Sequence, residues 1–372
     1  MKTIGIIAEF NPFHQGHRYL IDEAVKETGA ECVVSVMSGS FTQRGMPAVY
    51  DKWRRAESAL ENGVNLVLEL PAVYSCNSAE YFARGGVEVL EGLGAVDKLV
   101  FGSEEGDLDK MIHCAELLKN EEESITESIR EKIKEGYSYP KARETALEEL
   151  GLCSNLKFIR EPNNILGIEY LKWLEKMEPF TIKRQGKGHH RSASELRAEI
   201  RRKEPEVLEI PEKNYFNLVR AKILQSEDEE LEKVFSAGAG LGLKMKKEIR
   251  YATDIDDFVE RIKSKAYTRT RINRMLTHTL LGIDGNVMKN AAPYIRVLGF
   301  DETGSKLLKQ IRKEESASIP VITNINKEAY LYPEIKDTLS VDILATDLYN
   351  LITEKDLYQN SDYVRQPVRM RR

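Results

Sequence analysis

Cysteine is scarce in this chain of 372 residues, and its four cysteines lie far apart in the sequence: Cys32, Cys76, Cys114 and Cys153. Without a C-x-x-C pair, they indicate neither a zinc knuckle nor a disulfide framework. Long hydrophobic runs are also missing, because no apolar stretch approaches the ~18 residues that a membrane helix requires. The N-terminal segment meets Glu9 and then Pro12 too early for a signal peptide. We therefore expect a soluble cytoplasmic protein without a membrane partner.

Neither sign of charge dominates the chain. It has 55 Lys and Arg residues against 60 Asp and Glu residues, for a net charge of −5. Hydrophobic residues make up 41% and charged residues 31%, which is typical of a globular protein and excludes disorder and fibrous repeats. The length predicts about two domains. Because the whole chain is mildly acidic, a nucleic-acid site would have to come from a local cluster of basic residues.

The first half of the chain alternates short buried strands with amphipathic helices. The strands are expected at residues 3–8, 32–37, 65–70 and 98–101, and the helices between them at 18–26, 52–61 and 78–91. Such alternation predicts an α/β fold with a Rossmann-like parallel sheet, whose ligands bind beyond the carboxyl ends of the strands. The loops to inspect are therefore residues 9–17, 38–50, 71–77 and 102–106.

The domain organisation follows from this pattern. We expect an α/β domain at residues 1–205 with a helical insertion around 107–150, and a mostly helical C-terminal domain at residues 206–372. In that second domain the pattern is mostly helical to about residue 298. Short β-branched runs near residues 320–325 and 340–344 predict a small α/β ending.

Two histidines stand where the first strand leads into the first helix. The free N–H groups and the dipole of a helix N-terminus favour an anion, and His14 and His17 share one face of the first turn. Gly16 between them removes a side chain where a phosphate could approach the backbone. The pattern alone is equally consistent with an anion site and with two histidines that merely cap a surface helix. A metal site is not predicted, because no acidic residue lies one helical turn away.

The segment Glu9-Phe10-Asn11-Pro12-Phe13-His14-x-Gly16-His17 resembles the tRNA(Met) cytidine acetate ligase family, within the HxGH nucleotidyltransferase superfamily. Other blocks match that family in the same order, and the similarity extends over most of the chain: Val36-Met37-Ser38-Gly39-x-Phe41-x-Gln43-Arg44-Gly45, Glu69-Leu70-Pro71, Phe101-Gly102-Ser103-Glu104 and Pro162-Asn163-Asn164-Ile165-Leu166-Gly167.

The resemblance implies an ATP-dependent ligase. Such an enzyme activates acetate as acetyl-adenylate with release of pyrophosphate, and transfers the acetyl group to N4 of the wobble cytidine in elongator tRNA(Met). It implies ATP, acetate and this tRNA as partners, with Mg²⁺ but no zinc, haem or flavin and no protein partner. His14 and His17 would be catalytic. The implied ATP contacts are Ile7, Ala8, Glu9, Phe10, Asn11, Pro12, Phe13, His14, Gln15, Gly16, His17, Arg18, Tyr19, Leu20, Gly102, Asn163, Arg184 and Gln185.

The loop that follows the second strand is rich in polar groups. Ser38, Gly39, Gln43 and Arg44 would line an acetate pocket or contact the polyphosphate, although residues alone favour an ordinary polar glycine loop. Gly102 would let the backbone approach adenosine, or would simply form a tight turn. One of the two asparagines at 163 and 164 is explained as a helix N-cap, which leaves the other for a ligand.

Residues 183–203 carry a net charge of +6 within an acidic chain. Ser192, Ser194 and Arg197 resemble the superfamily's Ser-rich second signature, in which hydroxyls and an arginine contact phosphates. Ala193 departs from the commonest form of that signature. The alternative is a solvated basic helix with an ordinary serine cap.

A second basic run, residues 261–274, contains six basic residues and no acid. It predicts contacts with tRNA phosphates and a stacked base, although such runs are often only solvated faces. The candidate contacts are Lys263, Lys265, Tyr267, Arg269, Arg271 and Arg274. Two other functions stay open, a small-molecule adenylyltransferase with the same HxGH site and a non-catalytic RNA-binding module.

Overall fold

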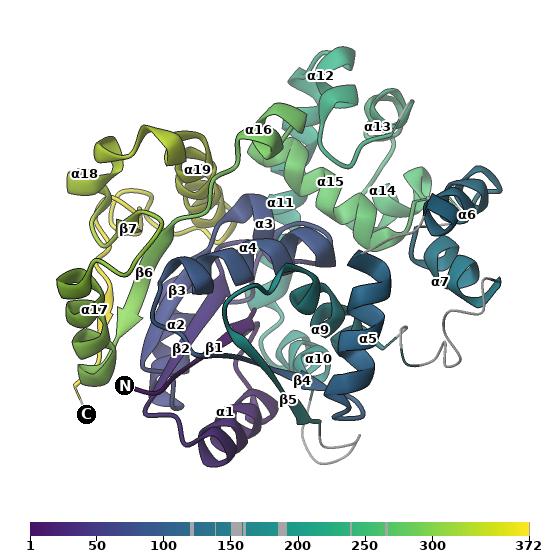
Figure 1. The fold of residues 1–372 in the computed structure, drawn as a ribbon. Coiled ribbons are helices and arrows are strands. Elements are labelled where there is room, and N and C mark those ends of the chain that lie inside the picture. The colour runs from purple at the N-terminus through teal and green to yellow at the C-terminus, as the bar shows by residue number, and fades with distance from the viewer. Residues whose placement is uncertain are drawn as a thin grey trace.

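One mixed sheet organises the chain, as the computed structural model shows (Figure 1). The structure describes residues 1–119, 123–137, 139–149, 158, 161–184, 192–238, 240–264 and 267–371. Within these residues the sheet has eight strands in the order β5-β4-β1-β2-β3-β6-β7, and β8 also pairs with β6. The strands are β1 Thr3–Ala8, β2 Cys32–Ser38, β3 Leu66–Leu70, β4 Lys98–Ser103, β5 Glu178–Lys183, β6 Ile295–Phe300, β7 Val321–Ile322 and β8 Val368–Arg369.

The first five strands are parallel, as the alternating pattern predicts. β1 pairs in register with β2 from Thr3 opposite Cys32 to Ala8 opposite Met37, and β4 and β5 extend the sheet on the other side of β1. Strands β1 to β3 are almost continuously apolar because helices cover the sheet on both faces. The carboxyl ends of β5, β4, β1, β2 and β3 therefore meet along one edge in that order.

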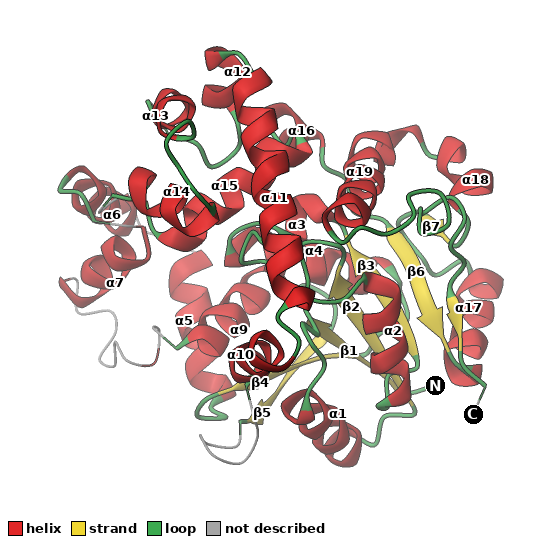
Figure 2. Ribbon diagram, turned by 180° about the vertical axis from the view of Figure 1, so that it is seen from behind, coloured by secondary structure: helices red, strands yellow, loops and turns green. Residues whose placement is uncertain are grey.

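Helices flank the sheet on both faces (Figure 2). In the first half they are α1 Gln15–Thr28, α2 Lys52–Glu61, α3 Ala72–Ser75, α4 Ala79–Gly92, α5 Leu108–Lys119, α6 Glu123–Lys134, α7 Tyr139–Glu149, α9 Pro162–Trp173 and α10 Ala193–Lys203. In the second half they are α11 Glu206–Gln225, α12 Asp228–Lys233, α13 Leu241–Glu248, α14 Ile255–Ile262, α15 Arg269–Leu281, α16 Gly285–Asn290, α17 Glu302–Glu314, α18 Ile325–Glu328 and α19 Lys336–Ile352.

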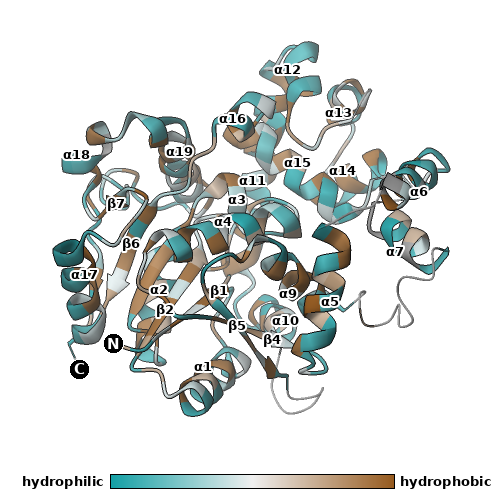
Figure 3. Ribbon diagram, viewed as in Figure 1, coloured by the Kyte–Doolittle hydropathy of each residue, from teal (hydrophilic) through white to brown (hydrophobic). Residues whose placement is uncertain are grey.

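Two apolar layers hold this arrangement together. On one face α1 and α2 pack against the sheet around Ile4 and Trp53. On the other face α4, α5 and α9 pack around Ile7, and the same core continues into α11, α14 and α15 through Tyr215 and Met275. Figure 3 shows apolar strands at the centre and more polar helices, such as α17, outside. Burial of both layers is the main stabilising contribution, at about 25 cal/mol per Å² of apolar surface.

The C-terminal region differs from the sequence prediction at two places. Residues 295–298, expected to be helical, belong to β6, which lies antiparallel to β3. The run at 340–344, expected to be a strand, lies inside α19, where buried positions recur with helical spacing. The expected strand near 320–325 is present as β7. Strands from both halves of the chain thus share one sheet, and the division at residue 205 stays a prediction.

Among the helices of the described residues, none combines the length and the apolar character needed to cross a membrane.

Candidate active site

The loop between β1 and α1, residues 9–14, is the histidine loop, and it folds around the two histidines. His14 is the N-cap of α1, and Phe10, with a φ of 46°, turns the chain just after the strand. The ring of His17 packs edge-on against Phe10 at 5.0 Å between centroids and lies 5.4 Å from the ring of Phe13. The rings of His14 and His17 stack at 3.7 Å with an interplanar angle of 20°. The aromatic contacts therefore fix both imidazoles at the start of the helix.

Backbone hydrogen bonds decide which ring nitrogen of each histidine carries the proton. The N–H of Gly16 donates to Nδ1 of His14 at 3.0 Å, and the N–H of His14 donates to Nδ1 of His17 at 3.3 Å. A nitrogen that accepts a hydrogen bond is unprotonated, so each neutral ring carries its proton on Nε2. The capping interpretation is thus correct for the two Nδ1 atoms, and it orients both Nε2–H groups as donors.

The environment keeps His17 neutral. Burial lowers the pKa of His17 well below its ordinary value of 6.5, and electrostatic interactions with His14 and Arg184 lower it further. The ring is therefore a hydrogen-bond donor through Nε2 at neutral pH rather than a cation. Gly16 matters for the same pair, because a Cβ at this residue would lie 2.9 Å from Cε1 of His14. The space next to Gly16 is taken by the His14 ring.

A second group of polar residues lies at the ends of β4 and β5. Nη1 of Arg184 donates to Oδ1 of Asn163 at 2.6 Å, and Nδ2 of Asn163 donates to Oε1 of Glu104 at 2.6 Å. Asn164 is fully buried and accepts from the N–H of Glu104 at 3.2 Å, so it is the structural member of the asparagine pair. The stem of Arg184 crosses Gly102, where a Cβ would lie 3.3 Å from Cγ of Arg184.

Arg55 on α2 joins the loops at the carboxyl ends of β1 and β2. Its buried guanidinium donates to the carbonyls of Glu9 at 2.8 Å, Ser38 at 2.9 Å and Tyr50 at 2.9 Å, and also to that of Gly39. Arg55 was not predicted from the sequence, although a charged residue on a helix that packs against a parallel sheet could have signalled such a role. Arg55 determines the distance between the histidine loop and the loop at residues 38–50.

A buried ion-pair network lies beneath the same loop. Nζ of Lys52 lies 2.8 Å from Oε2 of Glu69 and 2.8 Å from Oδ1 of Asp362, and all three side chains are almost fully buried. Glu69 supports Gly39 directly, because a Cβ at Gly39 would lie 2.3 Å from Oε1 of Glu69. This network was not predicted from the sequence either, because Asp362 lies about three hundred positions from Lys52 and Glu69.

Glu9 is the acidic residue that three arginines share. Its Oε1 accepts from the N–H of Gln43 at 2.8 Å, and its charge favours the charged forms of Arg55, Arg197 and Arg274. Arg197 on α10 donates to the carbonyl of Asn11 at 2.7 Å and to Oγ of Ser194 at 3.1 Å. The charges of Asp51 and Glu69 also act on Arg55, which leaves Glu9 with the guanidiniums of Arg197 and Arg274, an arrangement that suits an anion.

Several predicted ATP contacts have other partners in the structure. The side chain of Ile7 packs in the core, and Asn11 holds the N–H of Val49 at 2.8 Å. Arg18 forms an exposed ion pair with Asp22 at 2.7 Å. The remaining residues of the segment belong to the end of β1, the histidine loop and the start of α1: Ala8, Phe10, Pro12, Phe13, Gln15, Tyr19 and Leu20. Among them, Tyr19 and Leu20 pack against the apolar layer between the sheet and helices α1 and α2. Gln185 lies outside the described residues.

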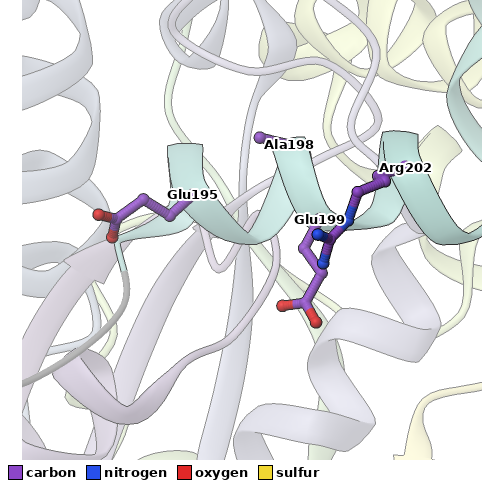
Figure 4. A pocket seen from close by; sticks show the side chains of 4 residues that line it. All are labelled: Glu195, Ala198, Glu199 and Arg202. Carbon is purple, nitrogen blue, oxygen red and sulfur yellow. The ribbon is translucent and has the colours of Figure 1, made fainter.

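Of the Ser-rich signature, Arg197 contacts the histidine loop, whereas Ser192 has a hydrogen-bond partner on its own helix. Oγ of Ser192 accepts from the N–H of Glu195 at 3.2 Å, as an ordinary N-cap. A hollow on α10 is lined by Glu195, Ala198, Glu199 and Arg202 (Figure 4). The spacing of 3.6 residues per turn places these positions on the side of the helix away from Arg197. The hollow is therefore not part of the candidate active site.

The predicted RNA-binding run is partly neutralised by acids of α14. Arg269 lies 2.5 Å from Asp256 and 2.9 Å from Glu260, and Lys263 lies 3.5 Å from Glu260. The guanidinium of Arg271 stacks over the ring of Tyr267 at 4.6 Å. Arg274 contacts the loop at residues 38–50, and Lys265 lies outside the described residues.

Known proteins are similar to this chain along most or all of its length. The family model described as HIGH Nucleotidyl Transferase matches residues 1–207 and 193–363. The tRNA(Met) cytidine acetate ligase of Caldanaerobacter subterraneus subsp. tengcongensis is 39% identical over 94% of this chain and 95% of that protein. That of Thermoanaerobacter sp. is 36% identical over the full length of both. The crystal structure of Thermotoga maritima TmcAL bound with alpha-thio ATP superposes with a TM-score of 0.91 at 30% identity over both full chains. By its sequence and its fold, the chain belongs to the tRNA(Met) cytidine acetate ligase family.

Proposed function

We propose that this protein is an ATP-dependent ligase that forms acetyl-adenylate and acetylates N4 of the wobble cytidine of elongator tRNA(Met). The observation that carries the proposal is the pair of stacked histidines at the start of α1, held with their Nε2–H groups as donors. The names of the full-length relatives support the choice of reaction. ATP is the proposed nucleotide, because the relative from Thermotoga maritima was crystallised with an ATP analogue.

In the first step an acetate oxygen attacks the α-phosphorus of ATP, the bond to the bridging oxygen breaks, and pyrophosphate leaves. No nucleophile of the protein is required, so catalysis consists of positioning and charge stabilisation. His14 and His17 form the catalytic pair, and His17 donates Nε2–H to the oxygens on which charge develops. Arg197 and Ser194 face the β- and γ-phosphates. Arg184, Asn163 and Gly102 receive the nucleoside beyond β4 and β5.

Mg²⁺ stays a prediction of the sequence. Among the residues that the structure describes, no three His, Cys, Asp or Glu side chains gather as a metal site. Enzymes commonly bind Mg²⁺ through substrate phosphates and one or two carboxylates. Such an ion would be held mainly by the phosphates of ATP, and the histidines and arginines are the protein groups to which the proposed step is assigned.

In the second step N4 of the cytidine attacks the acetyl carbonyl, AMP leaves and N4 loses a proton. The wobble base must leave the anticodon stack to reach the adenylate. The helical region α11–α15 is the proposed tRNA-binding part, and it packs directly against the loop at residues 38–50. This proximity supports a role in presenting the anticodon to the site.

The direct test is to incubate the protein with ATP, acetate and mixed tRNA and to analyse the digested nucleosides by mass spectrometry. We expect N4-acetylcytidine, only when both ATP and acetate are present, in elongator tRNA(Met) alone. A nucleotide conjugate of a small molecule instead would favour an adenylyltransferase with the same HxGH site. Binding of tRNA without any product would favour the non-catalytic module.

Replacing both Arg269 and Arg271 by Ala is expected to weaken tRNA binding. The ion pairs of Arg269 are exposed and contribute little, so RNA phosphates can take over its guanidinium. The slope of log K against log salt should fall by roughly 0.7–0.9 for each phosphate that the variant no longer neutralises. Filter binding across a salt series measures this slope. Lys306→Ala with Lys309→Ala, two exposed changes on α17, is the control. If the salt slopes of the two double variants are equal, Arg269 and Arg271 do not contact the tRNA.

A further inference from the structure

Arg274 on α15 is a largely buried arginine to which the described residues give no ion-pair partner. Its Nε donates to the carbonyl of Gln43 at 2.7 Å, and no carboxylate of the described residues lies within ion-pair distance of its guanidinium. Burial lowers the pKa of Arg274 to about 10, and only the more distant charge of Glu9 and the Cys76 thiol oppose this effect. The side chain is still charged at neutral pH. A buried cation that lacks a direct counter-ion is costly unless an anion joins it.

The backbone packing fixes Arg274 against the loop that follows β2. Gly45 has a φ of 68°, and a Cβ at Gly45 would lie 2.2 Å from the backbone nitrogen of Arg274. One turn further along α15, Oγ1 of Thr277 donates to the carbonyl of Gly45 at 2.9 Å. The helix and the loop are thus in direct contact over two successive turns, and the guanidinium is held at the carboxyl edge of the sheet.

The same loop offers polar groups that have no hydrogen-bond partner among the described residues. Within this part of the chain, the buried Nε2 of Gln43 makes no hydrogen bond, and neither does Oγ of Ser38, a residue that is fully buried at the end of β2. Buried donors of this kind cost free energy unless a ligand or water satisfies them. The N–H of Gln43 is bonded to Glu9, which follows β1. The unsatisfied amide therefore lies one strand away from the histidine loop.

We propose that Arg274, with Gln43 and Ser38, forms the subsite for the carboxylate substrate. A guanidinium and a side-chain amide can hold the two oxygens of a small carboxylate together, in the geometry that arginine favours. This proposal rests on the proposed ligase function. It assigns Arg274, which the sequence predicted as a tRNA contact, to the binding of the carboxylate in the first step of the reaction.

The order of strands separates this subsite from the nucleoside. Gly102, Asn163 and Arg184 lie at the ends of β4 and β5, on one side of β1, whereas Ser38 and Gln43 follow β2 on the other side. The histidine loop follows β1 between them. A carboxylate at Arg274 and a nucleoside at Arg184 would therefore approach the histidines from opposite sides, so that the two substrates do not compete for the same space.

Steady-state exchange of pyrophosphate into ATP tests the subsite, with acetate and ATP varied separately. Arg274→Gln is expected to raise the KM for acetate by roughly 10- to 150-fold, the range for losing a hydrogen bond to a charged group. The KM for ATP should stay unchanged. Arg274→Lys keeps the charge and a donor but lacks the planar fork, so its KM for acetate should also rise. Arg250→Gln, which removes an exposed guanidinium on the same helical region, serves as the control.

Binding of acetate without turnover separates this proposal from the ligase function. Isothermal titration of acetate into the protein, in the presence of a non-hydrolysable ATP analogue, should show binding for the wild type and for Arg250→Gln but not for Arg274→Gln. If the wild type binds acetate in this way but catalyses no exchange, the ligase function fails and the subsite stands. If the variants show a normal KM for acetate, or a raised KM for ATP instead, the subsite is overturned and the ligase function stands.

Discussion

Replacing His17 by Ala is expected to reduce acetate-dependent exchange of pyrophosphate into ATP by about 10²–10³-fold, the usual cost of one preorganised donor in an active site. The physical reason is local. The Nδ1 of His17 accepts from the N–H of His14, and the aromatic contacts with Phe10 and Phe13 fix the ring, so its Nε2–H is a donor held in one orientation. Binding of tRNA should persist, because the helical region does not depend on this ring.

The measurement is the exchange rate at saturating ATP and acetate, together with tRNA binding. His113→Ala on α5, an exposed histidine away from the loop, should retain the wild-type rate. The pH dependence gives a second readout. Because the pKa of His17 lies well below 6.5, protonation of this ring should slow exchange only at pH values well below 6.5. A His17→Ala variant that exchanges pyrophosphate at the wild-type rate would refute the proposed role of the pair.

The histidine loop could be predicted from the sequence because its signal is local. A buried strand, a turn and a helix start within fifteen residues specify where His14 and His17 lie, and short-range patterns are the most reliable in a sequence. The parallel order of the first strands is likewise confirmed. The position of β6 could not be predicted in this way, because its pairing with β3 joins residues more than two hundred positions apart.

The basic run shows why charge counts along a sequence can mislead. Residues 261–274 contain no acid, but Asp256 and Glu260 lie just upstream on α14 and pair with Arg269 in space. Arg274, counted with the same run, is turned by the helix toward Gln43 instead of toward solvent. A helix of 3.6 residues per turn distributes a basic run around its circumference, so the side chains of one stretch of sequence face different surroundings.

The buried ion-pair network of Lys52 connects the sheet to the loop at residues 38–50, and a substitution of Lys52 tests this connection. Lys52→Met is expected to lower the free energy of unfolding by about 3–5 kcal/mol, because it leaves Glu69 and Asp362 as buried carboxylates without their shared cation. Arg296 lies 3.7 Å from Asp362 and compensates that residue in part, so Glu69 carries most of the cost. Urea unfolding measures the loss. Lys306→Met on α17 is an exposed control, expected to stay within about 0.5 kcal/mol of the wild type.

The pH dependence of this loss follows from the carboxylates. Burial raises the pKa of Glu69 even with Lys52 present, and removing the lysine raises it further. A carboxyl group with a higher pKa in the folded state than in the unfolded state binds protons preferentially when folded, so acidification favours the folded state. The deficit of Lys52→Met should therefore shrink as the pH falls from 7 toward 5, and Lys52→Met combined with Glu69→Gln should recover part of it at pH 7. Since Glu69 also supports Gly39, a deficit that is independent of pH and unaffected by the second change would mean that the network does not hold this loop through its charges.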